Sequence, residues 1–210
     1  MLDKNINESF AEFDITRLTE RIEMLKCGLE NRILVLDGAM GTMIQNHPLE
    51  ENDFRGKDFI DVEVNQKGNN DILTLSQPNI ISDIHRAYLD ANADIIKTNT
   101  FSSTKIAQAD YGMDHQAYNL NLNAARLARN AVDQIYAIDT SRPRFVAGVL
   151  GPTNRTASIS SDVNNPAMRN ITFEELVESY SEATQGLLIG GADFIMVETV
   201  FDTLNCKAAL

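Results

Sequence analysis

Three residues with carboxylate or amide side chains stand at the ends of short apolar runs. Asp37 follows the first run, and Asn99 and Glu198 occupy equivalent positions in two related segments, 93–100 and 192–199. Such runs are typical of buried parallel strands, and ligands of parallel α/β folds bind at the carboxyl ends of the strands. Two carboxylates and an amide at one mouth would suit a small zwitterion, because carboxylates pair with its ammonium group while backbone donors hold its carboxylate.

The turn after the first apolar run reads Asp37-Gly-Ala-Met-Gly41. Gly38 and Gly41 tolerate positive φ and let a ligand approach backbone N–H groups closely. We therefore interpret this turn as the first wall of a binding site. A tight strand-to-helix turn with a capping Asp would explain the same residues without any ligand. A dinucleotide site is not indicated, because the turn lacks the Gly-x-Gly-x-x-Gly spacing.

Lys97 lies two residues before Asn99, so an extended strand would place both side chains on the same face. An amine inside a barrel could form a Schiff base, as in a lyase of the aldolase type. The alternative is a lysine that pairs with a neighbouring carboxylate.

The segments around these residues have the periodicity of alternating helices and strands. Pro78 is typical of a first helical turn, Thr172 and Glu175 form a capping box, and Gly190-Gly191 ends a helix. The polar connection 45–71 either covers the site or is a solvated insertion. Helices are predicted at 15–29, 75–91, 116–137, 172–189 and after Asp202, and strands at 33–37, 93–101, 144–152 and 192–200.

The repeated strand–helix unit predicts a parallel α/β fold. Four units make the first half of a (β/α)8 TIM-type barrel, in which residues 32–210 are a partial barrel and residues 1–31 are an N-terminal tail and flanking helix. A half barrel would leave apolar strand edges unpaired, so we expect the chain to be a fragment truncated at its C-terminus. The competing interpretation is an open, doubly wound sheet that is complete as it stands.

The composition excludes several classes of partner. The 210 residues carry a net charge of −12, which argues against nucleic acid and against an anionic membrane surface. Two distant cysteines, without a signal peptide or a membrane span, predict a reducing, cytoplasmic location. The three histidines show no metal-ligand spacing, and we predict no metal ligand in this chain.

Six segments, in order along the chain, resemble the homocysteine-binding domain of cobalamin-dependent methionine synthases, in the homocysteine S-methyltransferase family. These segments are Leu36–Gln45, Thr98–Phe101, Ile106–Gly112, Gly148–Thr153, Asp162–Pro166 and Val197–Asp202. Betaine- and sulfonium-dependent relatives share the Asp-Gly turn and the strand-end Glu. The stretches Arg55–Phe59 and Asn69–Pro78 favour the cobalamin-dependent enzyme.

The resemblance implies a (β/α)8 barrel whose mouth binds homocysteine as a zinc-bound thiolate. The thiolate takes a methyl group from cobalamin, which receives it from methyltetrahydrofolate on downstream modules of the parent protein. By the same resemblance, Asp37, Gly38, Ala39 and Glu198 contact the amino-acid end of homocysteine, and Asn99 lines the pocket.

The family's three zinc-binding cysteines are absent. Cys27 precedes the predicted barrel and Cys206 follows its fourth strand, so neither matches a ligand position. We therefore assign no catalytic residue and expect the 210 residues alone to be inactive and to bind zinc and homocysteine poorly. The alternatives are a stand-alone homocysteine methyltransferase that uses a sulfonium or betaine methyl donor, and a non-catalytic amino-acid-binding module.

Overall fold

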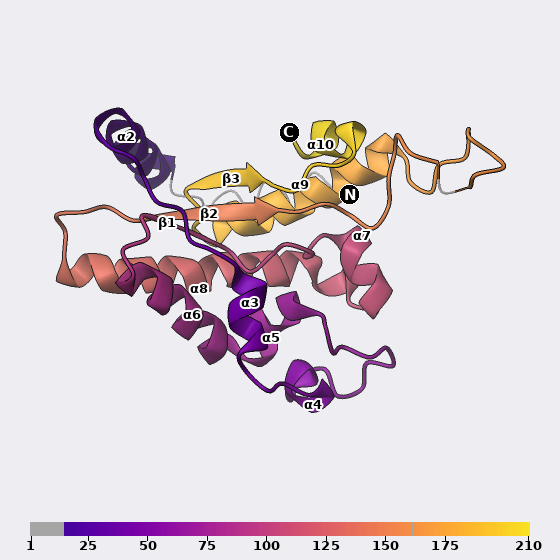
Figure 1. The fold of residues 1–210 in the computed structure, drawn as a ribbon, viewed down its shortest axis with the longest axis horizontal. Helices are drawn as coiled ribbons and strands as arrows, with labels where there is room; N and C mark the ends of the chain where they lie inside the picture. The colour runs from indigo at the N-terminus through magenta and orange to yellow at the C-terminus, as the bar shows by residue number, and fades with distance from the viewer. Residues whose placement is uncertain (1–14, 161) are drawn as a thin grey trace.

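The computed structural model describes residues 15–160 and 162–210, in which helices alternate with a small parallel sheet (Figure 1). Residues 1–14 of the predicted N-terminal tail lie outside the described part. The strands are β1 (Ile95–Lys97), β2 (Phe145–Leu150) and β3 (Phe194–Val197). The helices are α2 (Ile15–Asn31), α3 (Met40–Gln45), α4 (Glu51–Arg55), α5 (Leu73–Ser76), α6 (Pro78–Asp90), α7 (Lys105–Gln108), α8 (Ala117–Ile138), α9 (Phe173–Ile189) and α10 (Thr203–Ala209).

All three strands are parallel and follow the chain in the order β1-β2-β3. One predicted strand, the first apolar run, is wrong in its burial and length. It joins β1 through a single bridge between Leu36 and Ile95, and the side chains of Ile33 and Val35 are 88% and 52% exposed. The reason is its place at the edge, because among the described residues it has a strand neighbour on one side only.

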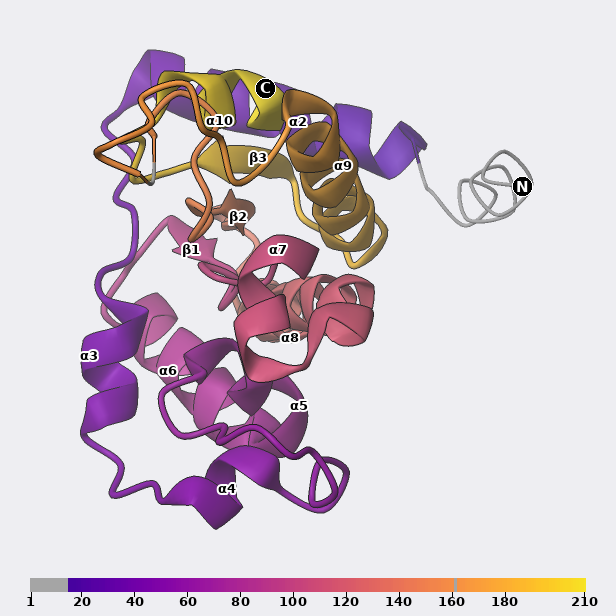
Figure 2. The same ribbon diagram turned by 90° about the vertical axis from the view of Figure 1, so that its right-hand side faces the viewer.

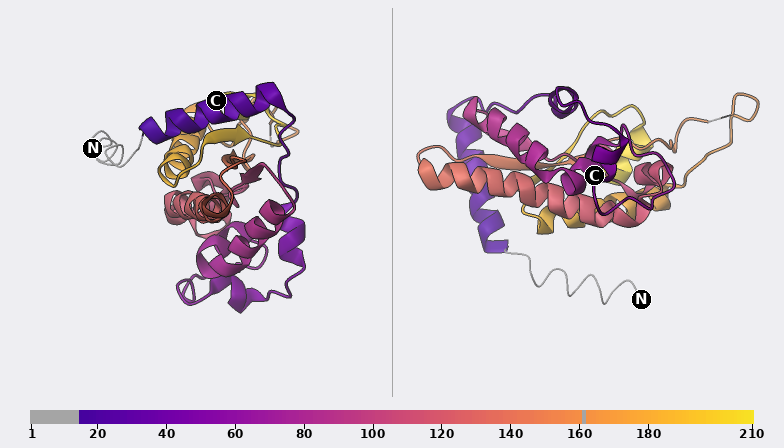
Figure 3. Two further views of the ribbon diagram at one scale, coloured as in Figure 1. Left: turned by 90° about the vertical axis from the view of Figure 1, so that its left-hand side faces the viewer. Right: turned by 90° about the horizontal axis from the view of Figure 1, so that it is seen from below.

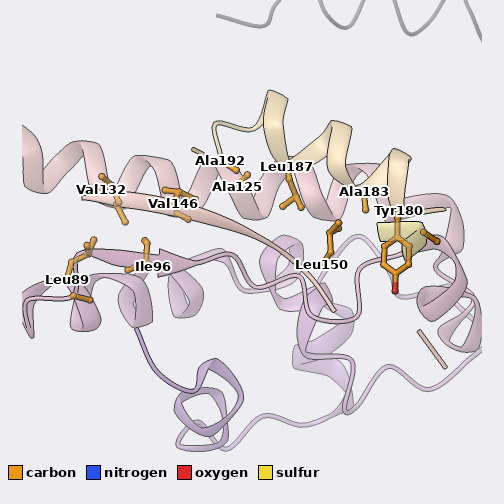
Figure 4. Packing of buried hydrophobic residues seen from close by; sticks show 14 of the residues in the cluster. Leu89, Ile96, Ala125, Val132, Val146, Leu150, Tyr180, Ala183, Leu187 and Ala192 are labelled. Carbon is orange, nitrogen blue, oxygen red and sulfur yellow. The ribbon is translucent and has the colours of Figure 1, made fainter. Parts of the chain in front are cut away.

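The main core lies between the strands and helices α6, α8 and α9, where apolar side chains gather in one layer (Figure 4). Helices α8 and α9 approach closely because α9 and its C-cap residue present glycines to α8. A Cβ on Gly190 would stand 2.5 Å from the carbonyl oxygen of Leu122, and one on Gly186 would stand 2.9 Å from that of Tyr118. The predicted capping box is confirmed, since Thr172 Oγ1 accepts from the backbone N–H of Glu175 and the Glu175 carboxylate accepts in return.

The segment 45–71 is folded and is not a solvated insertion. It contains α4 and packs with α3 and α5 at the end of the molecule far from α10 (Figure 2). This part of the fold surrounds a second apolar cluster that includes Phe54 and Phe59. Arg55 orders this segment, because its guanidinium donates to the carbonyls of Phe59 and Val64 and pairs with Glu51. Gln66 and Asn69, which follow Arg55 in the same segment, are also buried.

Two equivalent aspartates lie at the amino ends of the strands. Asp193 accepts from the backbone N–H of Val146 at 2.7 Å and pairs with Arg21 of α2 and Arg129 of α8. Arg21 thereby ties α2, which buries no residue completely, beside β3 (Figure 3). The assignment of residues 1–31 as an N-terminal tail and flanking helix stays a prediction.

Asp94 repeats the arrangement one strand earlier. It accepts from the backbone N–H of Val35 at 2.9 Å and pairs with Arg32 and Arg142 at 2.7 Å each. Burial raises the pKa of this carboxyl, but hydrogen bonds from the two arginines outweigh burial and hold the pKa well below its usual range. The carboxylate therefore stays ionised and anchors the edge segment to β1.

His85 of α6 is fully buried, and neither ring nitrogen has a hydrogen-bond partner among the described residues. Burial lowers its pKa to about 4, so between pH 6.5 and 4 the unfolded chain binds a proton that the folded chain does not. Stability is therefore lost as the pH falls through this window, by about 2 kcal/mol between pH 7 and pH 5. We expect His85→Leu to remove this loss, measured as the urea unfolding free energy at both pH values.

The matched control is His115→Leu, at an exposed histidine, which should leave the pH dependence of the wild type unchanged. An equal pH dependence in His85→Leu and the wild type would contradict the burial argument.

Candidate functional site

A cavity of about 360 Å³ opens where β1 and β3 end. Its walls come from the turn that begins α3, from residues 68–71, from the segment after β1 and from the first residue after β3. The lining residues are Ala39, Met40, Gly41, Gly68, Asn69, Asn70, Asp71, Lys97, Thr98, Asn99, Thr100, Phe101, Ser102, Tyr111, Val149 and Glu198. The carboxyl ends of the strands thus meet a segment that closes over them.

Of the five residues predicted for this site, Ala39, Asn99 and Glu198 line the cavity. Asp37 and Gly38 are not part of its lining. Asp37 lies directly behind it, because its Oδ2 accepts a hydrogen bond of 2.8 Å from the backbone N–H of Lys97, which does line the cavity. The structure therefore brings the predicted carboxylates to one place.

Asp37 is 9% exposed, and its Oδ1 is buried without a hydrogen-bond partner among the described residues. Burial raises the pKa of this carboxyl to about 7, against the opposing effect of the Lys97 backbone hydrogen bond and charge. One carboxyl oxygen is thus available for a donor that the described part of the chain does not supply.

Lys97 extends its ammonium toward Glu198, with 3.2 Å between Nζ and Oε2. The two side chains are 22% and 24% exposed, so the pair faces the cavity and is shielded from bulk water on its other sides. An ion-paired ammonium has no lone pair with which to attack a carbonyl. The geometry favours the paired lysine over the Schiff-base lyase.

Asn99 is 5% exposed, and its amide donates to the backbone oxygen of Asn70 at 2.9 Å. This bond attaches the segment 68–71 to the end of β1. The neighbouring threonines fasten β1 to β2, because Thr100 donates to the oxygen of Val149 and Thr98 accepts from its N–H. Asn99 therefore shapes the wall of the cavity.

Glu198 is followed by an unusual backbone conformation. Thr199 has φ of +57°, in the left-handed region that non-glycine residues seldom adopt. Such conformations persist where the surrounding structure determines them, and they gather at functional sites. The turn at Thr199 redirects the chain immediately after Glu198, the first residue after β3.

Sequence reasoning missed Asp71 as a residue of this cavity. Asp71 is 4% exposed, and its Oδ2 accepts from the backbone N–H of Ser102 at 2.8 Å. Burial raises its pKa to about 7. Asp71 lies in a long segment without a repeating pattern, so no periodicity indicates it. The signal that the sequence offers is the polar triplet Asn69-Asn-Asp71 directly before an apolar run.

The buried Asp37 carboxyl makes a testable contribution to stability. Its pKa is raised in the folded chain, so the folded state keeps a proton that the unfolded state loses above about pH 4, and stability falls as the pH rises to 7. Between pH 5 and pH 8 this amounts to about 2 to 3 kcal/mol. We expect Asp37→Asn to lack this fall, measured by urea unfolding at the two pH values.

Asp83→Asn, at an exposed position of α6, is the matched control and should reproduce the pH dependence of the wild type. Asp71 titrates in every one of these proteins, so it cancels in the comparison. A steep fall in Asp37→Asn equal to that of the wild type would show that Asp37 is ionised in the folded chain at pH 5.

The described residues contain no group of three or more His, Cys, Asp or Glu side chains that could hold a metal ion. Cys27 is exposed and Cys206 is partly buried, and both are free thiols. Within residues 15–160 and 162–210, no helix has the length and apolar character needed to span a membrane.

The chain is similar to a known protein family and to solved structures of a bacterial enzyme. The family model for homocysteine S-methyltransferase matches residues 34–210. Structures of the homocysteine methyltransferase MmuM from Escherichia coli in its oxidized and metallated forms are similar to this chain, with TM-scores of 0.66 and 0.64 at 23% and 22% identity. The aligned part covers 88% and 86% of this chain.

The apo form of the same enzyme matches with a TM-score of 0.58 at 21% identity and covers 86% of this chain. The chain spans 59%, 58% and 54% of the length of the three solved chains. At these identities the likeness shows a shared α/β fold.

Proposed function

This chain belongs to the homocysteine S-methyltransferase family, and on that premise we propose that its cavity holds the amino-acid end of homocysteine. The observation that carries the proposal is the convergence of Asp37 and Glu198 on Lys97 at the mouth formed by β1 and β3. Glu198 and the free Oδ1 of Asp37 accept the ammonium group of the amino acid. The turn at Gly38 and Ala39 and the wall around Asn99 complete this end of the site.

We also propose that residues 32–210 are the first half of a (β/α)8 barrel and that residues 1–31 flank it. The parallel order β1-β2-β3, extended by the edge segment at Leu36, supports this arrangement, because each strand pairs with the next one in the chain. The open doubly wound sheet is the competing arrangement, and it would place later strands on both sides of the first one.

The family resemblance implies that a zinc ion binds the thiol of the substrate. The described residues do not fit that role, because they offer no cluster of metal-binding side chains and the two thiols lie on separate helices, α2 and α10. We therefore propose that the residues of this chain bind and orient the amino acid and that the chain alone is inactive. Activation of the thiol belongs to residues outside this chain.

We propose that this chain is part of a cobalamin-dependent methionine synthase, a cytoplasmic protein with folate and cobalamin modules, in which methylcobalamin supplies the methyl group. Support comes from the stretches 55–59 and 69–78, which resemble the cobalamin-dependent enzyme, and residues 69–71 of the second stretch line the cavity. The second candidate is a stand-alone enzyme with a sulfonium or betaine donor. Methionine formation by the parent protein with methylcobalamin, S-methylmethionine or betaine as the sole donor separates the two.

Ligand-detected NMR on the 210-residue chain, with a chelator and a reductant present, tests the amino-acid site. We expect homocysteine, methionine and homoserine to bind competitively with millimolar affinity, because they share the amino-acid end. The matched ligand 4-mercaptobutyrate lacks the ammonium group and should not compete.

Two other outcomes have definite meanings. Micromolar binding of homocysteine without zinc would identify a non-catalytic amino-acid-binding module, and failure of all three amino acids to bind would overturn the proposed site. Elemental analysis of the purified chain should find no bound zinc. One tightly held equivalent would overturn the assignment of the metal to residues outside this chain.

A further inference from the structure

Among the described residues that line the cavity, Lys97 is the one with a positively charged side chain. The other charged lining residues, Asp71 and Glu198, are acidic. A zwitterionic amino acid brings both an ammonium and a carboxylate into this space. The acidic residues suit the ammonium, and Lys97 is the cation within the cavity that can pair with the carboxylate.

Lys97 is in contact with both carboxyl groups assigned to the substrate's ammonium. Its backbone N–H donates to Asp37 Oδ2 at 2.8 Å, and its Nζ lies 3.2 Å from Glu198 Oε2. The backbone contact is fixed by the strand, since Lys97 is the last residue of β1. The side-chain contact is not fixed in the same way, because the lysine side chain is long, flexible and 22% exposed.

The ammonium of Lys97 therefore occupies the place that the proposed function gives to the ammonium of homocysteine. Two cations beside one carboxylate in a partly desolvated pocket repel each other. A bound amino acid must displace Lys97 from Glu198, and the displaced cation then needs a new partner. The substrate's own carboxylate provides that partner, because it is one carbon away from the ammonium that took Glu198.

We propose that Lys97 is a specificity-determining residue that exchanges partners on binding, from Glu198 in the empty cavity to the α-carboxylate of the amino acid in the filled one. The inference rests on the proposed function, because it requires the substrate's ammonium at Glu198. No covalent bond forms or breaks, and the number of ion pairs rises from one to two. An amine without a carboxylate would displace Lys97 and leave it unpaired, so the site selects α-amino acids.

A lysine that only neutralises Glu198 would behave differently. Its removal would change the affinity for every ligand by a similar factor. Partner exchange predicts effects of opposite direction for two ligands, because the carboxylate gains from Lys97 while a bare amine competes with it. Homocysteine and 3-aminopropane-1-thiol form the matched pair, since they differ only in the carboxylate.

The experiment measures both affinities by ligand-detected NMR for the wild type and Lys97→Met of the 210-residue chain, with chelator and reductant present. We expect Lys97→Met to weaken homocysteine binding by on the order of 10-fold or more, as for other hydrogen bonds to charged groups. Binding of 3-aminopropane-1-thiol should stay equal or become tighter. Lys97→Arg should keep the preference for homocysteine, and Lys207→Met, at an exposed lysine of α10, should match the wild type.

Three results would overturn the inference. One is an equal loss for both ligands in Lys97→Met, and another is no loss for either. The third is equal affinity of the wild type for the two ligands, a readout that needs no variant and therefore holds even where Lys97→Met does not fold. If the wild type binds none of the amino acids, the proposed function fails and takes this inference with it; if it binds homocysteine without a preference over the amine, only the inference on Lys97 fails.

Discussion

Glu198→Gln is expected to lower the affinity of the chain for homocysteine by on the order of 100-fold, or about 3 kcal/mol. The amide has the size of the carboxylate but not its charge, so the substrate's ammonium loses its main partner in a partly buried pocket. The variant also leaves Lys97 without its ion pair, so the positive charge of Lys97 is no longer compensated beside the substrate's ammonium. Titration with homocysteine under metal-free conditions measures the loss.

Glu178→Gln is the matched control, because Glu178 is an exposed residue of α9 outside the cavity lining. Its homocysteine affinity should equal that of the wild type. Thermal unfolding of both variants checks that each remains folded. An affinity of Glu198→Gln within a factor of three of the wild type would remove Glu198 from the proposed site.

Gly151→Ala is expected to destabilise the chain by about 4 kcal/mol or more, at the far end of the range for single substitutions. Gly151 follows β2, and a Cβ at this position would overlap the carbonyl oxygen of Phe101. That oxygen belongs to the backbone and cannot rotate away as a flexible side chain would. Since Phe101 lines the cavity, the same substitution should also distort the site, and urea unfolding measures its cost.

Gly41→Ala is the control for this prediction, because the nearest atom to its added Cβ, Asn70 Nδ2, is 3.8 Å away. Gly41 lies in α3, where alanine favours the helix by about 0.5 to 1 kcal/mol. Gly41→Ala should therefore be as stable as the wild type or slightly more stable. A Gly151→Ala chain within 1 kcal/mol of the wild type would show that the contact with Phe101 relaxes easily.

The buried carboxyl groups around the cavity affect stability and ligand binding in opposite directions. The Asp37 and Asp71 carboxyls are buried with raised pKa values near 7, which costs stability at neutral pH. Asp37 keeps a buried carboxyl oxygen without a hydrogen-bond partner among the described residues, directly behind the cavity lining. We expect Asp37→Asn to gain stability at pH 8 and to bind homocysteine more weakly, because a site prepared for a cation holds negative charge before the cation arrives.

Local signals in the sequence predict most of the helices. The apolar periodicity of 116–137 corresponds to α8, and the side chain of Asp202 accepts from the N–H groups of Leu204 and Asn205 at the start of α10, as its position after a strand indicates. These features depend on residues within a few positions of one another. Short-range chemistry alone therefore specifies them.

Long-range contacts decide what local patterns could not predict. The arginine partners of Asp94 and Asp193 come from α2, from the residue after α2, from α8 and from the segment before β2, and no spacing in the sequence connects them. Local patterns could not predict the packing of segment 45–71 for the same reason. Arg55 donates hydrogen bonds to carbonyl groups that follow it along an irregular backbone. The predicted burial of the first apolar run was wrong, because burial depends on what lies beside a strand.

The sequence by itself determined the family, the repeated strand–helix unit and the positions of Asp37, Asn99 and Glu198 at strand ends, because periodicity and motif spacing are properties of the chain. Only the tertiary structure decided how these residues are used. It placed Lys97 between the two carboxyls, brought Asp71 into the same cavity and turned the amide of Asn99 toward the wall. The physical reason is that charge compensation and desolvation depend on distances in space, and residues 37, 97 and 198 become neighbours only when parallel strands align.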